Sequence, residues 1–103
     1  MTLETKKTDT VRVDLSEYYY IIVFDEYFCK ACYKNLSDEK ILMIYNKKGL
    51  DKIDRISLYN SIKKIYKSAD IYFVCTTLPK DFKINRITKY DNGKQKISLS
   101  KIY

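Results

Sequence analysis

The hydrophobic and polar positions divide the chain into short apolar segments and one longer periodic segment. Residues 18–24 (YYYIIVF) are continuously apolar and rich in β-branched and aromatic side chains. This composition predicts a strand that is covered on both faces. The runs at 41–45 and 71–75 predict two further buried strands, and the alternation at 11–15 predicts a half-buried one.

Helical periodicity is clearest over residues 53–69. Its apolar positions form one stripe of a 3.6-residue repeat: Leu58, Tyr59, Ile62, Ile65, Tyr66 and Ala69. Asp51 and Asp54 precede the stripe and are suited to cap the helix N-terminus. Residues 29–36 predict a second, short helix. Asn92-Gly93 predicts a tight hairpin turn between strands at 82–90 and 94–102, because both residue types tolerate positive φ.

The resulting order is strand, strand, short helix, strand, helix, strand and C-terminal hairpin. Strands that alternate with helices favour parallel pairing, with the helices packed on the sheet. A chain of 103 residues is long enough for one domain and too short for two. We therefore expect a single α/β domain with a mixed sheet over residues 8–103, preceded by a polar, flexible N-terminus over residues 1–7.

The chain is basic, with a formal net charge of +7 from 20 Lys and Arg and 13 Asp and Glu. One interpretation is a binding module for nucleic acid or an acidic protein partner, with bases stacking on the cluster at Tyr18, Tyr19 and Tyr20. The lysines are spread along the chain, which favours a role in solubility. Strand alternation would send Tyr18 and Tyr20 to one face and Tyr19 to the other, and packing is the favoured role of all three.

The sequence contains no run long enough for a membrane span and does not begin with a signal peptide. We therefore expect a cytoplasmic protein if Met1 is the native start. A periplasmic or secreted protein is expected if a signal has been removed.

The sharpest chemical signal in the sequence comes from its cysteines. The chain has three Cys and no His. Cys29 and Cys32 form a C-x-x-C motif, in which the first thiol suits a nucleophile and the second a resolving thiol. A helix beginning near Cys29, together with Lys30, would favour the thiolate. Two alternatives are a zinc site completed by Cys75 and a carboxylate, and two reduced cysteines that only pack. For Cys75 itself the favoured interpretation is a small buried hydrophobe.

The stretch YYIIVFDEYFCKACYK at 19–34 resembles the start of a thioredoxin-like domain, of the irregular, peroxiredoxin-related type. In that family an apolar strand leads through a short loop and an aromatic residue, here Phe28, into C-x-x-C. The later order of strand, helix, strand and hairpin is also similar. Lys30-Ala31 replaces Gly-Pro between the cysteines, and Val23 stands where the family has a buried carboxylate. The usual C-terminal helix is absent.

The resemblance implies thiol–disulfide exchange with protein thiols or disulfides. Electrons come from a partner's thiols, so that no cofactor and no metal are needed. Cys29 is then the nucleophile and Cys32 the resolving thiol. Phe28 shields the pair, and Pro79 is the only candidate for the family's cis-proline, which presents a backbone edge to a bound peptide.

Overall fold

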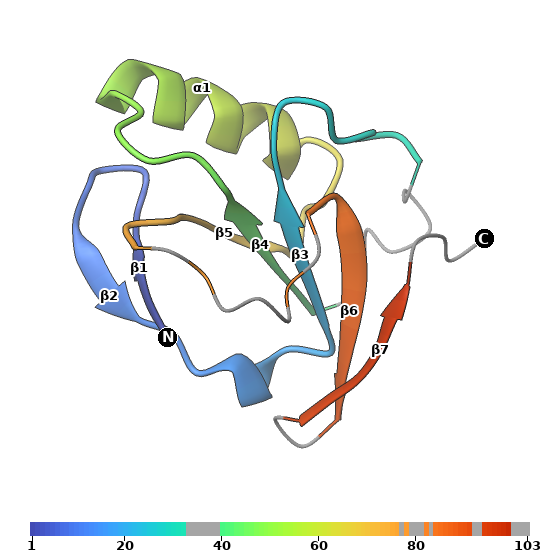
Figure 1. Ribbon diagram of the computed structural model, residues 1–103. Helices are drawn as coiled ribbons and strands as arrows, with labels where there is room; N and C mark the ends of the chain where they lie inside the picture. The colour runs from blue at the N-terminus through green and yellow to red at the C-terminus, as the bar shows by residue number, and fades with distance from the viewer. Residues whose placement is uncertain (33–39, 77, 79–81, 83, 92–93, 100–103) are drawn as a thin grey trace.

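One mixed sheet with a helix on one face makes up the computed structural model of the protein (Figure 1), which describes residues 1–32, 40–76, 78, 82, 84–91 and 94–99. In these residues the sheet order is β2-β1-β5-β4-β3-β6-β7. The elements are β1 (Thr2–Glu4), β2 (Thr10–Arg12), the 3₁₀ helix η1 (Leu15–Glu17), β3 (Tyr20–Phe24), β4 (Ile41–Tyr45), α1 (Lys52–Lys63), β5 (Asp70–Phe73), β6 (Arg86–Asp91) and β7 (Lys94–Leu99).

Parallel pairing holds the centre of the sheet, as the alternation of elements predicted. Strand β4 lies between β3 and β5 and is parallel to both. Antiparallel hairpins extend the sheet on either side, β1–β2 next to β5 and β6–β7 next to β3. The protein is therefore of the α/β class with a mixed sheet. No helix among the described residues is long and apolar enough to cross a membrane.

Strand β3 is buried on both faces, which explains its uninterrupted apolar sequence. Ile22 and Phe24 belong to a core cluster under α1, whereas Ile21 and Val23 belong to a second cluster on the opposite face. The side chains that pack on this second face come from the N-terminal residues 1–18 and from segments following β5. Packing on both faces therefore holds β3 in place, and this fixes where the loop after β3 begins.

Helix α1 begins at Lys52, one residue before the predicted start, and ends at Lys63, earlier than the predicted residue 69. The Asp51 side chain caps it by accepting a hydrogen bond of 2.9 Å from the Asp54 amide. The chain leaves the helix after Lys63 because it must turn back to enter β5. Tyr66 and Ala69 are nevertheless fully buried. The apolar side chains of the predicted stripe are therefore buried partly from the helix and partly from the turns that follow it.

The N-terminal residues, expected to be flexible, contain strand β1. Leu3 is fully buried, and β1 lies between β2 and β5. The tyrosine cluster also differs from strict alternation, because β3 begins only at Tyr20. Tyr18 is buried in the second cluster, Tyr20 packs against the first, and Tyr19 is 44% exposed. Tyr18 and Tyr20 therefore lie on opposite faces, and their side chains pack.

The C-terminal hairpin is present, with Asp91 paired to Lys94 across a two-residue connection. Its first strand is shorter than expected and runs from Arg86 to Asp91, whereas the second begins at Lys94 as predicted and is described up to Leu99. Residues 92 and 93, which carry the predicted turn, lie outside the described residues.

A buried guanidinium joins α1 to the N-terminal hairpin. The Arg55 residue is 3% exposed, and its side chain forms a 2.9 Å ion pair with Glu4. It also donates to the carbonyls of Leu50 at 2.7 Å and Thr5 at 3.4 Å, and it lies over the Phe73 ring. Only a planar fork of donors fits these partners together.

Replacing this side chain by lysine tests its contribution to stability. Arg55→Lys keeps the charge but leaves buried acceptors unpaired, so the free energy of unfolding should fall by about 2 kcal/mol. Urea denaturation measures this loss, with Arg12→Lys, on the exposed face of β2, as the matched control. A loss no larger than that of the control would contradict the assignment.

At the amino ends of the central parallel strands, Tyr18 is anchored by a carboxylate. Its hydroxyl donates a 2.6 Å hydrogen bond to Asp70, which also pairs with Lys40 at 3.4 Å. These three residues precede or begin the parallel strands β3, β4 and β5. The pKa of Tyr18 is raised above its ordinary value of 10.0. Burial is the largest cause, and the hydrogen bond with Asp70 is the second.

A raised pKa makes stability depend on alkaline pH. The unfolded phenol ionises first, so the contribution of Tyr18 is full below about pH 10 and is lost as the pH rises further. Tyr18→Phe should therefore lose less stability than wild type between about pH 9 and about pH 11. Urea denaturation at both pH values measures the difference, with the half-exposed Tyr19→Phe as control. An alkaline loss in Tyr18→Phe equal to that of wild type would contradict this origin.

Candidate functional site

The loop after β3 begins with a reciprocal pair of side chains. Asn85 donates a 2.7 Å hydrogen bond from Nδ2 to Oδ1 of Asp25, and the Asp25 amide donates to Oδ1 of Asn85 at 3.0 Å. Asn85 adopts the left-handed conformation (φ 61°) that asparagine tolerates, and its amide donates to the Val23 carbonyl at 2.7 Å. The end of β3 is thus fixed to the residue that precedes β6.

Two further contacts shape the loop between Asp25 and the first cysteine. The Asp25 carboxylate accepts a 2.9 Å hydrogen bond from the amide of Tyr27, and its carbonyl accepts a 3.1 Å bond from the amide of Phe28. The Phe28 residue is 7% exposed, and its ring lies 5.5 Å from the Phe24 ring between centroids. Phe28, predicted to shield the cysteines, is therefore a core anchor immediately before Cys29.

Cys29 and Cys32 form a disulfide, with their Cα atoms 5.4 Å apart. The Cys32 amide donates a 3.2 Å hydrogen bond to the Cys29 carbonyl, which closes a single turn around Lys30 and Ala31. In the described part of the predicted 29–36 helix, the chain thus forms a turn. Residues 33–39 lie outside the described residues.

The two cysteines differ in exposure. Cys29 is exposed, whereas Cys32 is partly buried and packs against the cluster under α1. An external thiolate must reach a sulfur from solvent along the direction of the S–S bond. The arrangement therefore favours attack at Cys29, with Cys32 as the departing sulfur.

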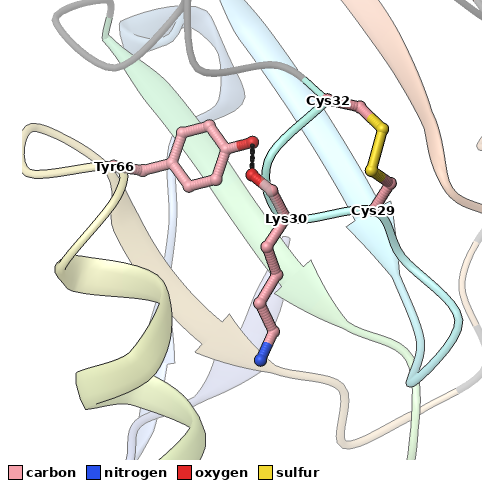
Figure 2. Close-up of a disulfide and its surroundings, with 4 residues drawn as sticks. All are labelled: Cys29, Lys30, Cys32 and Tyr66. Atoms are coloured by element: carbon pink, nitrogen blue, oxygen red, sulfur yellow. Dashed lines mark hydrogen bonds between the residues drawn. A yellow bond between two sulfur atoms is a disulfide. The ribbon is translucent and has the colours of Figure 1, made fainter.

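The Lys30 side chain points away from the disulfide (Figure 2). Its Nζ lies 3.5 Å from Oγ of Ser61 on α1. The sequence suggested that this ammonium would favour a thiolate at Cys29, but the structure directs it towards the helix instead. The carbonyl of Lys30 faces the opposite way, towards Tyr66.

Tyr66 is the residue of the site that the sequence did not reveal. It is fully buried, and its hydroxyl donates a 2.7 Å hydrogen bond to the Lys30 carbonyl, between the two cysteines (Figure 2). The sequence placed Tyr66 only in the apolar stripe. The sequence could have indicated that Tyr66 has a polar partner, because a buried tyrosine hydroxyl needs one. It could not have indicated which residue that partner is.

A second phenol lies beside the same loop. Tyr45, at the end of β4, is buried, and its hydroxyl donates to Oε2 of Glu26 at 3.4 Å. Burial, and next the charge of Glu26, raises the pKa of Tyr45. Tyr45 therefore keeps its proton at neutral pH and acts as a hydrogen-bond donor.

The remaining predicted residues lie apart from this centre. Cys75 is partly exposed rather than fully buried, because it follows the end of β5, and its Sγ lies 3.4 Å from the Thr2 carbonyl. Pro79 lies outside the described residues. In the part of the chain that the structure describes, no group of three His, Cys, Asp or Glu side chains is arranged to hold a metal ion.

No protein-family model, curated protein or solved structure matches this chain. The chemistry of the site is therefore inferred from its own geometry. Three features define the site: a disulfide in the loop after a buried strand, an exposed first cysteine, and a loop fixed by buried anchors.

Proposed function

We propose that the protein carries out thiol–disulfide exchange through Cys29 and Cys32, on a thioredoxin-like domain. The observation that carries this proposal is the unequal exposure of the two cysteines in one disulfide turn. A purely structural disulfide has no need of a sulfur open to solvent. An exchange disulfide requires one, because the reaction begins with attack by an external thiolate.

The exchange balances without a cofactor. A thiolate of a partner protein attacks Sγ of Cys29, the Cys29–Cys32 bond breaks, and Cys32 leaves as a thiolate that takes a proton from solvent. A second thiolate of the partner then attacks the partner sulfur that is bonded to Cys29. The partner's disulfide forms, the mixed disulfide breaks, and Cys29 leaves as a thiolate. The partner's dithiol is oxidised by two electrons and the protein's disulfide is reduced. The reverse sequence reduces a partner disulfide, with Cys29 as the nucleophile.

The element order supports the thioredoxin-like interpretation. A buried strand leads into the cysteine motif, and a strand, a helix, a further strand and a hairpin follow. One departure concerns proton transfer. Val23, at the position of the family's buried carboxylate, is itself buried in an apolar cluster, and the nearby Asp25 is bound to Asn85. Protonation of Cys32 by solvent is consistent with its partial exposure.

Variants of the three cysteines test the proposal. In Cys32→Ser the mixed disulfide at Cys29 cannot be resolved, so the reduced protein mixed with glutathione disulfide should accumulate a glutathione adduct at Cys29. The same treatment of Cys29→Ser should give an adduct at Cys32 about tenfold more slowly, because Cys32 is less exposed than Cys29. Intact mass and peptide mapping follow both reactions.

Cys75→Ser is the matched control, because Cys75 lies outside the disulfide turn. It should exchange at the wild-type rate. Equal adduct formation in the Cys29→Ser and Cys32→Ser variants would overturn the assignment of Cys29 as the nucleophile.

A further inference from the structure

We propose that Tyr66 is a positioning residue for the cysteine pair, and that its hydrogen bond to the Lys30 carbonyl favours the disulfide over the dithiol. The inference rests on the proposed function and adds to it a means of setting the redox equilibrium. Its basis is a buried hydroxyl, supplied by the segment after α1, that donates to the carbonyl of the Lys30–Ala31 peptide between the two cysteines (Figure 2).

Tyr66 is well suited to act as a fixed donor. Its residue is fully buried among the side chains under α1. Its amide donates to the Ile62 carbonyl at 2.9 Å, and its carbonyl accepts from the Ala69 amide at 3.1 Å. The backbone is therefore held on both sides, and the hydroxyl presents its proton from a position that the core determines.

The acceptor lies within the turn that brings the two sulfurs together. The Cys32 amide closes this turn on the Cys29 carbonyl, so the orientation of the Lys30 peptide sets how Cys29 and Cys32 face each other. Tyr66 fixes this orientation through a 2.7 Å hydrogen bond, and the donor and acceptor residues are 36 positions apart in the sequence. The exposed contact between Lys30 and Ser61, at 3.5 Å, involves only the side-chain end.

Reduction removes the covalent link and leaves the turn held by non-covalent contacts. A hydrogen bond that is stronger in the disulfide form than in the dithiol form shifts the equilibrium towards the disulfide by that difference. One buried hydrogen bond is sufficient for a shift of about fivefold. For a two-electron couple this corresponds to a rise of about 20 mV in the reduction potential when the hydroxyl is removed.

Tyr66→Phe removes the hydroxyl and keeps the ring. The fraction of disulfide is measured in glutathione buffers of graded composition, by alkylation and intact mass. Tyr18→Phe is the matched control, because it also removes a buried tyrosine hydroxyl from a short hydrogen bond, at the other end of β3. Ser61→Ala tests the contact with the Lys30 side chain. We expect the equilibrium constant for reduction to rise about fivefold in Tyr66→Phe and to stay at the wild-type value in the other two variants.

A second measurement does not depend on exchange with glutathione. The free energy of unfolding of the disulfide form is compared, in urea, with that of the form reduced by dithiothreitol. The difference between the two, the stability gap, should become smaller in Tyr66→Phe by the free energy that corresponds to the same change of about fivefold in the equilibrium constant. An unchanged gap and an unchanged equilibrium constant would overturn the positioning role, as would an equal shift in Tyr18→Phe. Failure of the wild-type pair to equilibrate with glutathione would count against the proposed function alone, since the stability gap still reports on Tyr66.

Discussion

Burial of β3 on both faces is the constraint on which the rest of the structure depends. Its side chains alternate between the cluster under α1 and the cluster on the opposite face, and its backbone pairs with β4 and β6. A strand held in this way ends at a defined place. The loop from residue 25 to residue 32 therefore starts from a fixed point, and the disulfide lies a short distance beyond it.

Three anchors fix the loop between the end of β3 and the disulfide. Asn85 fixes Asp25 at the start of the loop, Phe28 buries its ring in the core, and Tyr66 binds the carbonyl between the cysteines. Asn85 and Tyr66 act through hydrogen bonds, whereas Phe28 acts through apolar packing. Asn85 and Tyr66 lie far from the loop in the sequence, so distant parts of the chain hold it in place. The cysteine turn is consequently attached to the core on one side, while Cys29 is exposed on the other.

Local pattern was sufficient for the elements whose burial is complete. The bounds of β4 were predicted to the residue, because its five side chains are all buried and a turn follows them. Strand β1 was missed since only Leu3 marks it as apolar and pairing with β2 and β5 defines it. The end of α1 was misjudged because residues after Lys63 satisfy the helical stripe while forming turns.

The site shows the same division between local and distant information. The C-x-x-C spacing singled out the two cysteines that form the disulfide, and it left a zinc site and a reduced, packed pair open as alternatives. The direction of the Lys30 side chain and the role of Tyr66 depend on how the segment after α1 docks beside the cysteine turn. Such contacts join residues 31 and 36 positions apart, and no periodicity within either segment encodes them.

The central claim is that Cys29 and Cys32 work as one redox couple, and a thiol titration of the wild-type chain tests it most directly. The protein is equilibrated in glutathione buffers of graded potential, alkylated, and analysed by intact mass with peptide mapping. We expect both cysteines to become open to alkylation together, as one two-electron transition within the range of known oxidoreductases, about −120 to −270 mV. Independent alkylation of the two thiols, or a disulfide that resists reduction across this range, would contradict it.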